Sequence, residues 1–470
     1  MDCRDHVGSN RGGVAVSMGS AAYDAIVVGA GFAGLSAAAR LAEAGARTLV
    51  LEARPRLGGR ATAFADRVTG ELVDNGQHVL FGCYHETFAF LRRIGAEANV
   101  RLQPALRVPF VEDGGDPTEL VCPDLPSPFH LLGGVLDWPA LPVRERLSVL
   151  RLARPLALAR RQLAGNSRLA VASPGETVET WLRLNGQGPG ICDALWYPLA
   201  VAALNQSPKH AAAQPFVRVL AGLFGSDPRD AAVGLPVRPL HEAYAEPARA
   251  FIEARGGSVR TGALASVLVD GDHVRNVEVG GARYLSRTVI AAVPWFALAS
   301  LVLRRPPVPK GFDALVDAAT QMVSLPIVTV NLWYDRAVMD EPFVGVRGGS
   351  IHWIFDRRAV SGRERSHLSL VTSDARDLVG LTNEEIVSNA VRSVAAVLPR
   401  AHAGRVLRGS VVREKRATFS LAPGQPARPG TVTAVAGLLL AGDWIDTGLP
   451  GTIESAVVSG HRAAERVLGA

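Results

Sequence analysis

A glycine-rich turn near the start of the chain constrains the fold more than any other feature. An apolar run at residues 25–28 leads into GAGFAG at residues 29–34, and apolar residues then recur with helical spacing. A second apolar run, 48–51, ends in Glu52, 18 residues after the last glycine of the turn. This strand–turn–helix–strand context predicts a Rossmann-type, dinucleotide-binding unit with a parallel sheet, and therefore an α/β fold.

Each position of the turn has a physical role. Gly29 permits the tight turn, Gly31 lets backbone N–H groups approach a pyrophosphate, and Gly34 allows the helix to pack closely on the strand. The helix N-terminus offers partial positive charge to the phosphates. Glu52 is expected to accept hydrogen bonds from the ribose hydroxyls and to repel a 2′-phosphate, which disfavours NADP. The residues predicted to bind the nucleotide here are Gly29, Gly31, Phe32, Ala33, Gly34 and Glu52.

The residues after Glu52 indicate which dinucleotide is bound. The segment ARPRLGGR at 53–60 resembles the RxGGR element of the flavin-containing amine oxidase and phytoene desaturase superfamily, which implies FAD as the cofactor. A second glycine pair lets another loop approach this long cofactor near its flavin end, and arginines there offset phosphate charge. The contacts implied by the resemblance are Ala53, Arg54, Arg56, Gly59 and Arg60, together with Gly76 further along.

The resemblance continues in the middle and at the end of the chain. The β-rich segment 257–269 resembles the strand that holds adenine, with Val267 as the expected backbone contact. An apolar run ending at Gly442 and Asp443 resembles the element that meets the ribityl or pyrophosphate part of FAD. Thr452 and Ile453 open a helix whose N-terminus is expected to face the flavin, where its dipole stabilises negative charge.

Because these elements fall at the start, middle and end, cofactor segments must alternate with substrate segments. The predicted architecture is a Rossmann-type FAD-binding domain interleaved with an α+β substrate-binding domain. The predicted boundaries are a disordered leader at 1–22, FAD-binding segments at 23–105, 235–296 and 426–470, and substrate segments at 106–234 and 297–425. Met1 and Met18 are both candidate start residues.

Two departures from the amine oxidases point to a neutral, apolar substrate. The strand expected at 324–333 has no lysine, and the C-terminal turn reads LPGT at 449–452, without the tyrosine of an aromatic cage. An amine cation would lose its cation–π partners without such aromatic walls.

Longer blocks carry a closer resemblance. DNGQHVLFGCY at 74–84, PIVTVNLW at 326–333 and GDWIDTGLP at 442–450 resemble the hydroxysqualene dehydroxylase family of bacterial hopanoid pathways. The resemblance implies a reductive step in which hydroxysqualene and reduced FAD give squalene, water and oxidised FAD.

The implied chemistry needs a donor to the departing hydroxyl, because an allylic alcohol leaves poorly. The allylic cation that results would accept hydride from flavin N5. His78 and Gln77, on a turn expected near the flavin, are the candidate catalytic residues. Two alternatives remain open. One is an FAD-dependent carotenoid (phytoene-type) desaturase or isomerase, and the other is a non-catalytic flavoprotein scaffold for neighbouring squalene-pathway synthases.

A C30 isoprenoid substrate resides in the bilayer, so a membrane-docking segment is expected in the chain. Residues 143–168 hold seven arginines against the single acid Glu145, along with several leucines, among them Leu147, Leu150 and Leu156. This composition suits an anionic lipid surface, although a solvated helix with inward-facing leucines has the same pattern. No apolar stretch approaches the ~20 residues of a membrane span. A cytoplasmic protein, peripheral on the inner membrane surface, is therefore expected.

Composition bears on the other partner classes. The formal charge of +6 over 470 residues is too dilute to indicate nucleic-acid binding. The four cysteines lie far apart and the histidines form no ligand pattern, so no metal is expected.

Overall fold

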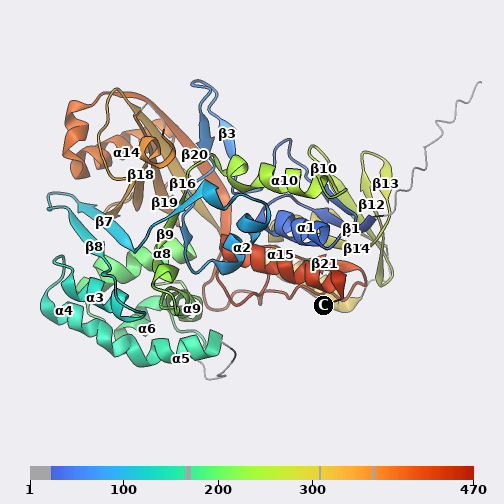
Figure 1. Cartoon of the computed structure of the whole chain (residues 1–470), viewed down its shortest axis with the longest axis horizontal. Helices are drawn as coiled ribbons and strands as arrows, with labels where there is room; N and C mark the ends of the chain where they lie inside the picture. The colour runs from blue at the N-terminus through green and yellow to red at the C-terminus, as the bar shows by residue number, and fades with distance from the viewer. Residues whose placement is uncertain (1–22, 164, 166–170, 306–308, 363–365, 470) are drawn as a thin grey trace, which may run out of the picture.

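The computed structural model describes residues 23–163, 165, 171–305, 309–362 and 366–469 (Figure 1). The predicted leader 1–22, with both candidate start residues, lies outside this part of the chain. Across the described residues two large sheets stand at opposite ends of the molecule, each covered by helices (Figure 1).

The cofactor end is built on a five-stranded parallel sheet of order β10-β2-β1-β14-β21. The strands are β10 (Ser258–Arg260), β2 (Thr48–Leu51), β1 (Tyr23–Val28), β14 (Ser286–Ala291) and β21 (Leu438–Leu440). The predicted strands before and after the glycine turn are therefore confirmed, as is the helix between them, α1 (Phe32–Glu43). The predicted C-terminal helix is also confirmed as α15 (Ile453–Leu468).

Alternation along β1 divides the core of this end into two layers. Ala25 and Val27 face a cluster formed with α1, α15 and α10 (Glu246–Glu253), whereas Ile26 and Val28 face the opposite side. There the sheet packs against a four-stranded sheet of order β13-β12-β11-β15 and against two helices. Both faces are buried, which explains why the strands read as continuous apolar runs. The elements on the second side are β11 (Ala265–Asp270), β12 (His273–Val279), β13 (Ala282–Tyr284), β15 (Val302–Arg305), α11 (Trp295–Leu301) and α12 (Lys310–Gln321).

This second layer changes one predicted boundary. The sequence prediction began a substrate segment at residue 297, but β15 pairs in parallel with β11, and α12 contributes Phe312 and Val316 to the same apolar cluster. β15 and α12 therefore pack with the cofactor end. No sequence pattern marks this strand, because β15 is mostly exposed and Val302 is its one buried residue.

The other end is a mixed seven-stranded sheet of order β20-β16-β19-β18-β17-β7-β8. One face carries α14 (Asn383–Val397), and the other faces a layer of helices. The strands are β7 (Arg107–Glu112), β8 (Thr118–Val121), β16 (Ser324–Tyr334), β17 (Phe343–Arg347), β18 (Trp353–Asp356), β19 (Ser366–Ser373) and β20 (Val406–Phe419). The helical layer holds α3 (Phe129–Asp137), α4 (Val143–Ser148), α5 (Ala153–Leu163), α6 (Val178–Leu184), α8 (Tyr197–Leu204) and α9 (Ala213–Leu223).

Short elements join the two ends. β3 (Ala63–Ala65) and β4 (Leu72–Asp74) form a hairpin, and β5 (Leu80–Phe81), β9 (Val233–Pro236) and β6 (Val100–Leu102) form a small antiparallel sheet. The helix α2 (His85–Arg93) follows β5 and lies beside α15 (Figure 1). The small sheet thus pairs β9 with two strands, β5 and β6, that are more than 100 residues away in the sequence.

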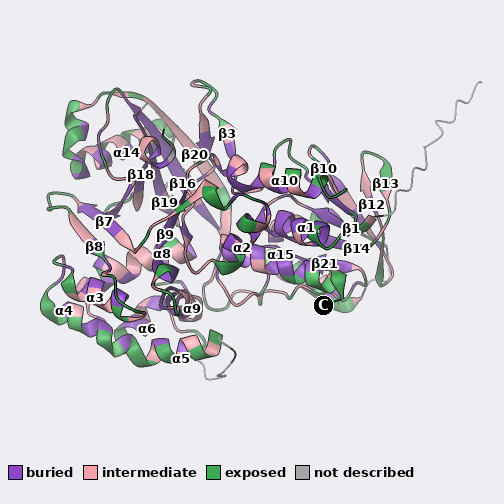
Figure 2. Cartoon of the chain, viewed as in Figure 1, coloured by how far each residue is buried: buried purple, intermediate pink, exposed green. Residues whose placement is uncertain are grey.

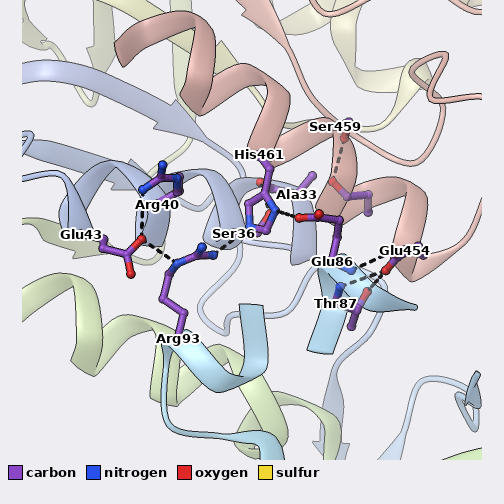
Figure 3. Close-up of polar contacts among 11 residues, drawn as sticks. Ala33, Ser36, Arg40, Glu43, Glu86, Thr87, Arg93, Glu454, Ser459 and His461 are labelled. Atoms are coloured by element: carbon purple, nitrogen blue, oxygen red, sulfur yellow. Dashed lines mark hydrogen bonds and ion pairs between the residues drawn. The ribbon is translucent and has the colours of Figure 1, made fainter. Parts of the chain in front are cut away.

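A buried carboxylate fixes α2 to α15 (Figure 3). Glu454, in the first turn of α15, accepts hydrogen bonds from the backbone N–H groups of Glu86 (3.0 Å) and Thr87 (2.9 Å) and from the Thr87 hydroxyl (2.6 Å). The N-terminus of α2 is therefore capped by a side chain from another helix. Burial raises the pKa of Glu454, and these three hydrogen bonds oppose that effect.

A histidine continues this network toward α1 (Figure 3). His461 Nδ1 lies 2.6 Å from Glu86 Oε2, and Arg93 donates to His461 Nε2 at 3.1 Å. Because an arginine only donates, Nε2 carries a lone pair and the imidazole is neutral. Arg93 also binds Glu43 of α1 at 2.9 Å, so polar contacts link α1, α2 and α15.

Candidate functional site

One cavity of about 660 Å³ extends from the five-stranded sheet to the helical layer of the other end. The loop after β1 and the N-terminus of α15 line its first part. β5, α3, α8, α9 and the strands β7, β17 and β18 line its far part. A ligand at the cofactor end and a ligand at the substrate end would therefore share one continuous space.

Glycines bring two backbone loops close together at the cofactor end. Gly58 N donates to Ala30 O at 2.8 Å, and a Cβ on Gly59 would lie 3.3 Å from Gly31 Cα. Gly58 and Gly59 have φ values of 104° and 60°, in the region that favours glycine. A side chain at Gly59 would fill the space between the two loops, and one at Gly58 would collide with the carbonyl oxygen of Ala61. Gly31 and Gly59 therefore form a cradle that only backbone atoms approach.

Glu52 is fixed at the wall of this cradle. Its Oε2 accepts from Ala30 N at 2.8 Å and its Oε1 accepts from Arg54 N at 2.9 Å, and the residue is 7% exposed. Both oxygens keep lone pairs that can accept hydrogen bonds from a ribose. Glu52, Ala53 and Arg54 all line the cavity.

Three of the predicted cofactor residues lie outside the cavity. Val267 is in β11, where it pairs with Val277 and Val302, so its backbone serves the four-stranded sheet; Ala263, Leu264 and Ala265 line the cavity instead. The prediction treated 257–269 as one strand, whereas this range holds β10 and β11, which belong to different sheets. Arg56 is exposed, with its guanidinium 5.3 Å from the ring centroid of Phe64. Gly34 has the packing role expected of it, since a Cβ there would overlap the carbonyl of Gly29.

Arg60 joins three elements near the middle of the cavity. It donates to Asp443 Oδ1 at 2.5 Å and to the carbonyl oxygen of Ala417 in β20 at 2.7 Å. Its guanidinium also lies 5.4 Å from the ring centroid of Trp295. The RxGGR loop, the end of β21 and the end of β20 are thereby held together. The predicted residues that line the cavity with Arg60 are Gly76, Gly442, Asp443, Thr452 and Ile453.

The turn after β4 carries the predicted catalytic residues. His78 Nδ1 lies 2.7 Å from the carbonyl oxygen of Gly76, which can only accept, so Nδ1 bears the proton. Burial lowers the pKa of His78, although the Gly76 carbonyl and Asp74 oppose that effect. His78 is therefore neutral at neutral pH, with a lone pair at Nε2, and cannot supply the proton that the sequence reasoning considered. Gln77 beside it also lines the cavity.

Several polar groups at the cavity wall were not predicted. Glu414 of β20 accepts a hydrogen bond from Asn75 Nδ2 at 3.0 Å. Thr418 accepts from Asn205 Nδ2 at 2.9 Å, which leaves its hydroxyl proton for another partner. Burial and nearby negative charge raise the pKa of Tyr84, which is therefore a neutral phenol. Asn75 and Tyr84 lie in the block 74–84, but no sequence motif marks Glu414 or Thr418, which reach the cavity through the pairing of β20 with β16.

The far part of the cavity is apolar. Trp196, Pro198 and Leu199 of α8 and the turn before it line this part, whereas Tyr197 does not. Aromatic rings reach this lining from elements other than the C-terminal turn, which has no tyrosine, as predicted. The aromatic residues of this lining include Phe81, Phe110, Phe224, Phe343, Trp353 and Phe355. Hydrocarbon and aromatic surfaces of this kind bind a long apolar molecule.

Neither a metal site nor a membrane span is found among the described residues. No group of three or more His, Cys, Asp or Glu side chains in this part of the chain could hold a metal ion. No helix in the same residues has the length and apolar character needed to cross a bilayer. Cys83, Cys122 and Cys192 are free thiols, and burial raises the pKa of Cys122 to about 12.

Comparison with known proteins agrees with this geometry. Residues 32–468 match the family model of flavin containing amine oxidoreductase. A hydroxysqualene dehydroxylase of Rhodopseudomonas palustris is 33% identical over 94% of this chain and 98% of its own length. The chain belongs to the hydroxysqualene dehydroxylase branch of the flavin-containing amine oxidoreductases. A 15-cis-phytoene desaturase of Synechococcus elongatus is 23% identical over 94% of this chain and 95% of its own.

Solved structures support the same fold. A putrescine oxidase bound to putrescine superimposes with a TM-score of 0.72 at 17% identity, covering 96% of this chain and all of the oxidase. The protein is thus an FAD-dependent oxidoreductase, as predicted. The glycine cradle, the fixed Glu52 and the Arg60–Asp443 pair suit FAD, because they combine close backbone approach with hydrogen-bond acceptors at one end and positive charge at the other.

Proposed function

We propose that this protein reduces hydroxysqualene to squalene in squalene and hopanoid biosynthesis. The observation that carries the proposal is the single cavity, which joins an FAD cradle to a hydrocarbon-lined chamber. The similarity to the Rhodopseudomonas protein supports the same substrate. In the balanced reaction, hydroxysqualene and the reduced cofactor yield squalene, water and FAD.

When bound in its reduced form, FAD supplies the hydride that replaces the hydroxyl group. The chain's own residues must hold the substrate carbon near the cofactor, stabilise the departing hydroxyl and exclude bulk water. Gln77 is the candidate donor to that hydroxyl. His78 lies beside it and is neutral, with a lone pair at Nε2. It is the candidate acceptor of a hydrogen bond from the same hydroxyl. Phe81 and Tyr84, an edge-to-face pair with centroids 6.0 Å apart, offer ring faces to developing positive charge on the allylic carbons.

The cofactor-site residues remain part of this proposal. The residues expected to contact FAD are Gly29, Gly31, Phe32, Ala33, Glu52, Ala53, Arg54, Gly59, Arg60, Gly76, Gly442, Asp443, Thr452 and Ile453. Thr452 caps α15 by accepting from Ser455 N at 3.2 Å, and the dipole of this 16-residue helix favours negative charge at its start.

The decisive experiment follows flavin reoxidation without oxygen. The holoprotein is reduced anaerobically, hydroxysqualene is added, and flavin absorbance and products are measured together. Reoxidation with one squalene formed per flavin supports the proposal. Stable reduced flavin with untouched alcohol contradicts it and favours the desaturase alternative. In that case oxidised enzyme should extend the conjugation of phytoene and shift its absorbance to longer wavelength.

We also propose that the protein docks on the cytoplasmic surface of an anionic membrane through α3, α4 and α5. Seven of the sixteen large hydrophobic side chains that are exposed in the described residues fall within 121–163, among them Phe129 (61% exposed) and Val143 (65% exposed). Figure 2 shows exposed residues along the outer sides of α4 and α5. Leu147 and Leu150 are also half-exposed, whereas Leu156 packs inward.

Charge complementarity favours lipid headgroups as the partner. Arg144, Arg151, Arg154 and Arg161 are exposed on the same segment. Arg146 is not available, because it donates to main-chain carbonyls that end α3 and precede α4. α3 also contributes Leu131 and Val135 to the cavity, so the docking surface and the substrate chamber share one helix.

The docking proposal is tested with vesicles that contain phosphatidylglycerol. Replacing Arg160 and Arg161 with Glu, or Phe129 with Ser, should reduce cosedimentation without changing FAD content. Arg275→Glu, at an exposed position of β12 at the cofactor end, serves as the charge control. Equal sedimentation of the wild type and the α5 variant would overturn the docking proposal.

A further inference from the structure

A buried arginine lies behind the candidate donor Gln77. Arg357, at the start of the short helix α13 (Arg357–Ser361), is 2% exposed. Its NH1 group donates to Gln77 Oε1 at 2.5 Å, and its NH2 group lies 3.1 Å from Asp74 Oδ2. Asp74 Oδ1 in turn accepts from the backbone N–H of Leu240 at 3.1 Å. A charged pair is thus buried directly behind the turn that carries Gln77 and His78.

Stability alone gives a poor reason for this pair. Removing two charges from water costs several kcal/mol, and well-packed apolar side chains of similar volume are often at least as stable. The pair does, however, fix a geometry. An arginine only donates, so the oxygen of the Gln77 amide must face Arg357. The NH2 group is then the end of Gln77 that can bind a substrate in the cavity.

The remaining contacts leave that NH2 group available. Among the described residues its contact is a long one, 3.4 Å to the carbonyl oxygen of His78, and a primary amide has two N–H bonds. The guanidinium cation also polarises the amide through its carbonyl oxygen, which strengthens the opposite N–H groups as donors. His78 cannot take this role, because its bound proton is directed to Gly76.

We propose that Arg357, held by Asp74, is a positioning residue that turns the Gln77 amide into a donor for the substrate hydroxyl and thereby makes the site selective for an alcohol over a hydrocarbon of the same length. This inference rests on the proposed function. A site built to bind a hydroxyl leaves its donor unpaired when the hydroxyl is missing. The product squalene has no hydroxyl, so the same contact favours product release.

The test compares two ligands that differ by one oxygen atom. Oxidised holoprotein is titrated with hydroxysqualene and with squalene in detergent, and the change in flavin absorbance reports binding. We expect Gln77→Leu to weaken hydroxysqualene binding about 10-fold while squalene binding changes less than about twofold. Gln77→Leu removes one acceptor from Arg357 but keeps its ion pair with Asp74, so it remains informative if an arginine variant loses FAD.

The role of Arg357 is tested with a double-mutant cycle that combines Arg357→Lys with Gln77→Leu. Arg357→Lys keeps the charge beside Asp74 but cannot span both partners, and it should lower the alcohol preference several-fold. In the Gln77→Leu background the same change should have no further effect on that preference, since residues that act through one another are not additive. Arg358→Lys is the matched control, because Arg358 is on the same helix but binds Asp356 and Met339.

The outcomes separate this inference from the proposed function. A wild-type protein that neither binds nor reduces hydroxysqualene overturns both. A wild type that reduces it, with an alcohol preference that Gln77→Leu leaves intact, overturns only the inference. Additive effects of Arg357→Lys and Gln77→Leu would likewise show that Arg357 does not act through the amide.

Discussion

The close contact between α1 and α15 gives a quantitative prediction. Gly460 of α15 faces the first turn of α1, and a Cβ there would lie 3.1 Å from the carbonyl carbon of Ala33 and closer still to its oxygen and to Ser36 Oγ. The carbonyl belongs to the backbone and cannot rotate away. Restoring a normal separation of about 3.5 Å requires the two helices to move apart by about 1 Å.

The cost of Gly460→Ala follows from two opposing terms. Overpacking a well-packed contact costs up to about 3 kcal/mol. Replacing a helical glycine by alanine returns about 1 kcal/mol, so the net loss of unfolding free energy is about 2 kcal/mol. For a chain of this length the melting temperature should fall by about 2 °C. FAD affinity should also fall, because the N-termini of both helices border the cofactor end of the cavity.

The assay is thermal unfolding of the holoprotein, together with FAD titration of the apoprotein. Gly222→Ala in α9 is the matched control, because its Cβ would lie 3.6 Å from Cys83 Sγ, an ordinary contact, and it should be neutral or slightly stabilising. If Gly460→Ala melts at or above the wild-type temperature with unchanged FAD affinity, the close-packing argument is refuted.

Three further predictions concern the cofactor wall and the buried histidines. Glu52→Gln should weaken FAD binding at least about 10-fold in the same titration, because its NH2 group must face the N–H of Ala30 or Arg54; wild-type affinity would contradict this. The free energy of unfolding should fall as the pH drops below about 6.5, because burial lowers the folded pKa values of four histidines and the unfolded chain therefore binds protons first. Above about pH 6.5 the same histidines should leave it unchanged. Melting curves between about pH 5 and 7.5 measure this dependence. His130→Leu should raise the melting temperature, most at acidic pH, because neither ring nitrogen of this buried residue has a partner among the described residues. The histidines with lowered pKa values are His78, His130, His352 and His461.

The cofactor end was largely predictable because its signals are local. The order of strand, glycine turn, helix and acid at 25–52 depends on backbone conformation and on neighbouring residues, and the structure has these elements where they were expected. The apolar run before Gly442 and the helix that begins at Ile453 are similar cases. All but three of the predicted site residues line one cavity.

The differences from the prediction arise where elements pair with one another. The boundary at 297 depends on which strand pairs with β11, and the strand that does so, β15, has little apolar pattern. Val267 lies outside the cavity because residues 257–269 form two strands that belong to different sheets. The same limit applies to the basic segment 143–168. Its composition does not indicate that Arg146 donates to main-chain carbonyls, or that Leu147 is exposed. Sequence spacing describes one element at a time, whereas these outcomes depend on contacts between elements.

The sequence by itself determined the dinucleotide-binding turn, the FAD signature and the resemblance to hydroxysqualene dehydroxylases, because each is written in consecutive residues whose backbone must take one form. Only the tertiary structure decided which polar groups meet at the cavity. Arg357 lies 280 residues from Gln77, and Glu414 lies 339 residues from Asn75. These pairs form because the seven-stranded sheet and the turn after β4 meet at the same cavity. No pattern within a single element predicts that meeting.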